Sequence, residues 1–288
     1  MSAETTTSNN TPISGHVTIV FTSDWGVSTG VGQAGRTHST IERGSNGHPV
    51  VRGTVITGVL REQAMLAAKA LDGPDEKSPK KWTNFALWLF GQDPDGKQGS
   101  VPHPRHVLFT DATPASSIPV HDTVSLSIDP TTGTARDQFL RFTERAAAGI
   151  LTGTFTLIDE AGAEISDRTT IEAARFLLGV AGLMVQGIGS GRSGGDGECT
   201  VLVSGEALAA CHERSTSKFV AYASDQSQAL RRSLKKLAAS FTEAVVNELP
   251  GPRQGGVQHR VGTVGGSDAD RSGGHHLILD LTLNSPIV

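Results

Sequence analysis

The stretch VQGIGSGRSGGDGECTV, residues 185–201, holds six glycines between positions 187 and 197 together with a single arginine, Arg192. An apolar stretch with helical spacing, residues 170–186, comes before these glycines, and a strand-like stretch, residues 197–205, follows them. This order of helix, glycines and strand decides between two classes of α and β protein. The spacing G-x-G-x-x-G is met by Gly189, Gly191 and Gly194.

A dinucleotide-binding fold has the opposite order, with a strand before the glycines and a helix after them. The pyrophosphate then meets the positive end of that helix, whereas this loop faces the electronegative carboxyl end of residues 170–186. We therefore expect no nucleotide cofactor at the loop. Two interpretations stay open: a plain flexible connection, or a loop whose amides and Arg192 follow a polynucleotide backbone independently of its sequence.

Composition limits the other classes of site. The chain has 288 residues, 34 glycines and a net charge of −4, so a nucleic-acid site has to be a local basic patch. Cys199 and Cys211 are the only cysteines, and their spacing suggests neither a zinc site nor a disulfide framework. We expect a cytoplasmic protein with no cofactor, no metal and no transmembrane helix.

Hydrophobic periodicity outlines the elements. Several predicted strands follow one another directly, which favours an α+β fold of ferredoxin-like type, βαββαβ with insertions, over a doubly wound parallel sheet. Thr54 is a candidate helix cap. The predicted strands cover residues 16–21, 105–112, 122–129, 152–159 and 197–205. The predicted helices cover residues 54–71, 136–149, 170–186 and 227–249.

Three regions follow from this pattern. Residues 1–14 are expected to form a disordered tail, residues 15–205 a ferredoxin-like domain, and residues 206–288 a C-terminal extension. The extension holds the basic helix 227–249, a flexible Gly-rich loop and a terminal strand, 275–284, which we expect to dock on a sheet edge. The basic helix is as compatible with a solvated face as with RNA or a neighbouring subunit. His275 and His276 have no evident third metal ligand.

A second Gly-rich segment is locally basic. In HPVVRGTVITGVLRE, residues 48–62, an arginine and a glycine stand at a predicted helix start, where free backbone amides suit a phosphate. Ordinary solvated arginines are the alternative. Trp82 and Trp88 could stack on bases, but their helical spacing favours the core. The candidate RNA-binding residues are Arg36, Arg43, Arg52, Gly53, Thr54, Arg61, Gly189, Gly191, Arg192, Ser193 and Gly194.

Taken in order, these segments resemble the RAMP superfamily of CRISPR-associated proteins, most closely the repeated backbone subunit of type III effector complexes. The resemblance covers residues 16–204. Pro130 departs from the family pattern. The segments that carry the resemblance are VTIVFTSDWGVSTGVGQAG, VVRGTVITGVLR, LFG followed by VLFTDA, IDPTTGTA, GTFTLI and GIGSGRSGGDG.

The resemblance implies an RRM-related, ferredoxin-like domain that binds CRISPR guide RNA. The guide RNA in turn pairs with target RNA. It also implies other CRISPR effector subunits as partners, stacked in a hetero-oligomeric filament. A hairpin thumb, expected within residues 112–135, would wedge into the guide–target duplex, while base pairing reads the sequence.

Cleaving members of this family carry an Asp where this chain has Thr37. His38 is one position away and could act as a general base, and Asp24 and Glu42 are the nearest carboxylates. We therefore predict a guide-RNA-binding structural subunit in antiviral defence. The alternatives are an active target-RNA endoribonuclease or a guide-processing ribonuclease of the same superfamily, and, more remotely, a nucleotide-binding enzyme.

Overall fold

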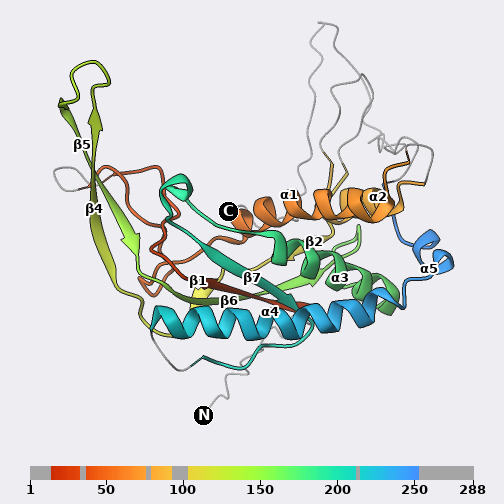
Figure 1. Cartoon of the computed structure of the whole chain (residues 1–288). Coiled ribbons are helices and arrows are strands. Elements are labelled where there is room, and N and C mark those ends of the chain that lie inside the picture. Colours follow the sequence, from red (N-terminus) through yellow and green to blue (C-terminus); the bar gives the residue numbers. More distant parts are fainter. Residues whose placement is uncertain (1–13, 33–36, 76–78, 93–102, 212–214, 253–288) are drawn as a thin grey trace, which may run out of the picture.

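The computed structural model describes residues 14–32, 37–75, 79–92, 103–211 and 215–252. Its centre is an antiparallel sheet with the strand order β2-β6-β1-β7, and the short β3 also pairs with β6 (Figure 1). Helices together with antiparallel sheets are compatible with the predicted α+β class. The strands are β1 (Gly15–Phe21), β2 (Val107–Phe109), β3 (Thr113–Pro114), β6 (Gly149–Leu157) and β7 (Cys199–Ser204).

The central strand β1 is buried almost throughout. Ile19 lies opposite Leu151 of β6 and Val201 of β7, and all three side chains are buried. Val20, which points to the other face, is also fully buried. Because both faces are covered, β1 reads as a nearly continuous apolar run, which explains why this strand was found from sequence.

Helix α1 (Gly53–Asp72) lies between β1 and β2 in sequence and buries Ile56, Leu60 and Ala64. The N-cap residue of the helix is Arg52, and its side chain makes no capping hydrogen bond. The prediction that Thr54 is the cap is therefore wrong. Thr54 is exposed and already helical. The helix ends at Gly73, whose φ of 77° suits a residue without a Cβ atom.

Helix α3 (Arg168–Met184) lies between β6 and β7 in sequence and begins at Asp167, whose carboxylate accepts a hydrogen bond from Thr170 N at 2.8 Å. Hydrogen bonds from the Thr170 side chain and, second, from its backbone N–H lower the pKa of Asp167. Two helical glycines bring the helix backbone onto β7. A Cβ atom on Gly182 would lie 2.8 Å from the carbonyl oxygen of Val201, so only glycine permits this approach.

The extension forms helix α4 (Thr216–Ala238) and the short helix α5 (Glu243–Asn247). The prediction of one helix over 227–249 is therefore wrong at both ends. Phe219 and Ala223 carry the buried stripe further upstream, and a turn at Ser240 directs Phe241 onto Trp82, with ring centroids 5.4 Å apart. Residues 1–13 and the predicted strand 275–284 lie outside the described residues.

Helix α2 (Lys81–Phe90) carries the two tryptophans that were candidates for base stacking. Trp82 is buried among aromatic rings, and Trp88 stacks on His106 with centroids 4.2 Å apart. Trp82 therefore belongs to the core and Trp88 is partly buried against it, which is the alternative that their helical spacing favoured.

A separate two-stranded sheet stands away from the main body (Figure 1). It is the hairpin of β4 (Val120–Ile128) and β5 (Ala135–Ala146), joined through a turn at 129–134. The predicted helix over 136–149 is therefore wrong. The four-residue spacing of Phe142 and Ala146 fits one face of a helix. In the structure, however, Leu140 and Phe142 lie on the same face of a strand, opposite Leu126 and Val124 of β4 respectively.

Candidate nucleic-acid interface

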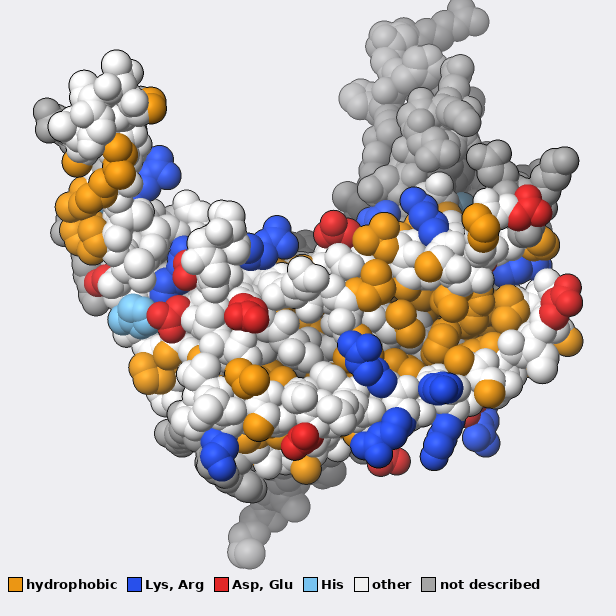
Figure 2. All heavy atoms as spheres, viewed as in Figure 1, with side chains coloured by type: hydrophobic (Ala, Val, Ile, Leu, Met, Phe, Trp, Pro, Cys, Tyr) orange, Lys and Arg blue, Asp and Glu red, His pale blue; other side chains and the backbone are white. Residues whose placement is uncertain are grey.

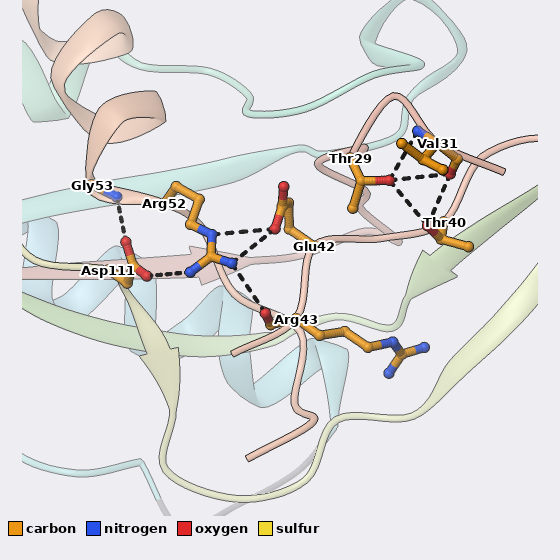
Figure 3. Close-up of polar contacts among 8 residues, drawn as sticks. All are labelled: Thr29, Val31, Thr40, Glu42, Arg43, Arg52, Gly53 and Asp111. Carbon is orange, nitrogen blue, oxygen red and sulfur yellow. Dashed lines mark hydrogen bonds and ion pairs between the residues drawn. The ribbon is translucent and has the colours of Figure 1, made fainter. Parts of the chain in front are cut away.

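The predicted RNA-binding residues fall in two Gly-rich segments, 36–61 and 189–194, which we call the two halves of the predicted cradle. The first half is held together by ion pairs (Figure 3). Arg52 donates to Asp111 Oδ2 at 2.8 Å and to Glu42 Oε2 at 3.0 Å, and its Nη2 also reaches the carbonyl oxygen of Arg43 at 3.2 Å. The hydrogen bond with Asp111 is the main cause that raises the pKa of Arg52. A phosphate would therefore compete with two carboxylates for this guanidinium.

The amino end of α1 is occupied in the same way. Gly53 N donates to Asp111 Oδ1 at 2.9 Å, so a carboxylate already takes the place that was predicted for a phosphate. Gly53 is needed for a different reason. A Cβ atom there would overlap the carbonyl oxygen of Phe109 in β2. The glycine permits close packing of a helix on a strand, and this contact is sufficient to explain its place in the motif.

Arg43 joins this segment to the hairpin. Its Nη2 lies 3.3 Å from Glu144 Oε2, and the same oxygen accepts a hydrogen bond from Ile41 N at 3.1 Å. Glu144 lies in β5 and its side chain is about 10% exposed. Arg43 therefore balances a mostly buried carboxylate at the base of the hairpin.

The second half of the cradle is the loop from Gly187 to Glu198, which contains the short 3-10 turn η1 (Arg192–Gly194). The loop is anchored to the segment after β1: Ser190 N donates to Gly26 O at 3.0 Å, and Gly197 N donates to Asp24 O at 2.7 Å. Its shape requires glycine at several positions. Left-handed φ angles occur at Gly189, Gly191, Gly195 and Gly197.

Arg192 and Ser193 lie at the exposed tip of this loop. Among the described residues, no ion pair involves Arg192. Both residues line a groove of about 920 Å³ between the loop and α1, together with Glu62 and Gln63. Arg192 is therefore an exposed cation without a carboxylate partner in the described part of the chain, although carboxylates also border the groove.

The loop is tied to the hairpin by a further ion pair. Arg145 Nε of β5 lies 3.0 Å from Asp196 Oδ2, and only about 11% of the Arg145 side chain is exposed. Asp196, Glu144 and Asp111 were not among the predicted site residues. The signal for Asp111 was present, since it lies two residues after the strand-like VLF, but nothing in the sequence pairs these carboxylates with particular arginines.

The other predicted binding residues are scattered. Arg61 is half-buried on α1, two turns from its start, and Gly194 is exposed in the glycine loop. Thr54 is exposed next to the occupied end of α1. Arg36 lies outside the described residues.

The candidate catalytic residues take part in structural contacts. His38 Nδ1 accepts a hydrogen bond from Phe142 N at 3.1 Å, so the neutral ring carries its proton on Nε2. Neither ring nitrogen then has a lone pair free to accept a proton. Asp24 Oδ2 lies 3.1 Å from His121 Nε2 at the base of β4. Thr37 is buried, and its hydroxyl oxygen has no hydrogen-bond partner among the residues that the structure describes.

The described part of the chain has no cluster of metal ligands and no membrane-spanning helix. There, no three His, Cys, Asp or Glu side chains come together as a possible metal site. Every helix in the same part is too short or too polar to cross a membrane. His275 and His276 lie outside it.

Comparisons with known proteins return solved structures only. No family model matches the chain, and no curated protein matches it. One similar structure is a chain of the type III-B Cmr-beta complex in its apo state, with 10% identity, a TM-score of 0.47, and 66% of this chain and 96% of that chain covered. A chain of Cmr-beta bound to cognate target RNA gives the same values.

A chain of a type IV-B CRISPR complex has 16% identity and a TM-score of 0.45, covering 72% of this chain and 97% of that chain. TM-scores below 0.5 do not establish a common fold.

Proposed function

We propose that this chain is a guide-RNA-binding structural subunit of a type III-like CRISPR effector complex, built on a ferredoxin-like RAMP domain. Two observations support the domain. The motif-like segments occur in the family's order across residues 16–204. The strand order β2-β6-β1-β7, with α1 between β1 and β2 and α3 between β6 and β7, is that of an antiparallel βαββαβ sheet.

The hairpin β4–β5 is the observation that carries the proposal. One of its faces presents apolar side chains to solvent, visible in Figure 2 as orange atoms along the projecting arm. An amphipathic hairpin without a covering element is costly in water unless a partner meets it. The exposed fractions are 52% for Val124, 55% for Leu126, 60% for Ile128 and 46% for Leu140.

Base faces are a suitable partner for this surface. Apolar side chains inserted between base steps unstack them and are covered by the separated bases. The other face of the hairpin is polar: Arg141 is exposed there, opposite Ser125. In this proposal the apolar face enters the guide–target duplex, while Arg141 and Arg192 contact the phosphate backbone without reading its sequence.

The test uses the full chain and a guide–target duplex with 2-aminopurine at successive positions. The wild type is expected to raise fluorescence at regularly spaced positions, where bases unstack. The double variant Leu126→Ser, Leu140→Ser should lose that signal but keep most of its affinity, because the phosphate contacts remain. The matched control, Ser125→Ala with Ser127→Ala on the polar face, should keep the signal. A wild-type chain that binds no RNA at low salt would refute the proposal.

The alternative of an active ribonuclease has no particular support among the described residues. His38 can accept a proton at Nδ1 only by giving up its bond with Phe142, and Thr37 replaces the expected Asp. The binding role would be contradicted if the purified complex cut target RNA at regular intervals and if Thr37→Ala or His38→Ala abolished cutting.

A further inference from the structure

The helical side of the protein has an apolar groove that the proposed RNA contacts do not use. The groove has a volume of about 340 Å³ and lies between α3 and α4. Met184 at one end is 37% exposed. Figure 2 shows a broad apolar area in this part of the molecule, bordered by a row of basic side chains. The apolar lining is made by Phe176, Val180, Leu183, Met184, Leu234 and Ala238.

The rim of the groove is positively charged. Residues 227–238 of α4 include four basic side chains and no acidic one. Two of them, Arg231 and Lys235, line the groove. Among the described residues, none of the four makes an ion pair. An apolar floor beside unpaired cations fits an occupant that carries both apolar and acidic side chains.

The chain itself contains such a segment, and the residues just after α4 pass close to the groove. Phe241, just after α4, lies 5.3 Å from Phe176 of the groove lining, measured between ring centroids. The described residues end at Pro252. The sequence HHLILDLTLN at 275–284 then supplies four leucines, one isoleucine and Asp280. The intervening residues are numerous enough to reach any part of α3 and α4, because an extended residue spans about 3.3–3.6 Å.

The sheet edge that was expected to receive this segment is not open at β7. The backbone of α3 lies against the outer carbonyl groups of β7. A Cβ atom added to Gly179 of α3 would lie 3.4 Å from the carbonyl oxygen of Val203. At the other end of the sheet, β2 has only three residues. The groove between α3 and α4 is an alternative apolar surface for a segment of this composition.

We propose that residues 277–283 dock in the groove between α3 and α4, with Asp280 beside Arg231 and Lys235. The segment thereby covers the exposed apolar floor and neutralises part of the basic row. This inference does not depend on RNA binding, since neither Arg192 nor the hairpin residues line this groove.

Disulfide trapping in the full chain tests the contact. Met184→Cys is combined with Leu279→Cys in a Cys211→Ser background. Cys199 stays in place because burial raises its thiol pKa to about 12, so it remains protonated. In the control, Val220→Cys takes the place of Met184→Cys. Val220 is 51% exposed and lies on α4 outside the groove. We expect an intramolecular disulfide in monomeric protein, at least fivefold more abundant for Met184→Cys than for the control.

A charge swap tests the orientation of the segment. Asp280→Lys should lower the trapping yield several-fold, and adding Arg231→Glu with Lys235→Glu should restore it. Equal yields for Met184→Cys and Val220→Cys would overturn the proposal. Disulfides formed only between two chains would also overturn it, because they would assign the groove to a second copy. A charge swap without effect would overturn the placement of Asp280.

Discussion

The two halves of the predicted cradle look alike in sequence but differ in the structure. Each combines glycines with arginine, yet Arg43 and Arg52 are bound to carboxylates from distant parts of the chain, whereas no described ion pair involves Arg192. The glycines differ as well: Gly53 permits packing, and Gly191 permits a left-handed turn. A count of basic residues therefore does not locate a phosphate site until the positions of the carboxylates are known.

The largest expected effect lies in the packed half. Gly53→Ala should lower the free energy of unfolding by about 3 kcal/mol, because its Cβ atom would overlap the backbone of β2. Urea denaturation of both proteins measures the difference. Gly58→Ala on the same helix is the matched control. It has nothing within 4 Å and should raise stability by about 0.5–1 kcal/mol.

A smaller loss is expected in the glycine loop. Gly191→Ala should cost about 1–2 kcal/mol, because Gly191 has a φ of 83° and its Cβ atom would crowd Asp196. Alkylation of buried Cys199 at pH 8 reports opening of the loop and should become faster in this variant. Gly194→Ala, which meets nothing within 4 Å, should alkylate at the wild-type rate. Equal rates for the two variants would show that the turn does not hold the loop closed.

The ion pairs of the first half are expected to matter for stability and not for RNA. Arg52→Ala should lower the free energy of unfolding by about 1 kcal/mol, since Asp111 and Glu42 lose their partner but remain partly accessible to water. Its affinity for guide RNA should change less than twofold. A tenfold loss of affinity in a fully folded Arg52→Ala protein would place this arginine on the RNA after all.

The strands of the main sheet could be predicted because β1 and β7 are short apolar runs whose pattern is set locally. The hairpin strand β5 could not, because Phe142 and Ala146 satisfy a helical spacing, and only pairing with β4 settles the choice. In the same way, the sequence singled out Arg52 and Arg192 equally. Glu42 and Asp111 reach Arg52 only through the fold, and Asp111 comes from 59 positions away.

The most direct measurement is the salt dependence of guide-RNA binding by Arg192→Ala, compared with Arg52→Ala and wild type. Arg192→Ala should keep its stability within about 0.5 kcal/mol, as expected for an exposed side chain. The slope of log K against log salt should become shallower by about 0.7 for Arg192→Ala, the value for one lost contact with a single strand, and stay unchanged for Arg52→Ala. A shallower slope for Arg52→Ala with a wild-type slope for Arg192→Ala would contradict the account.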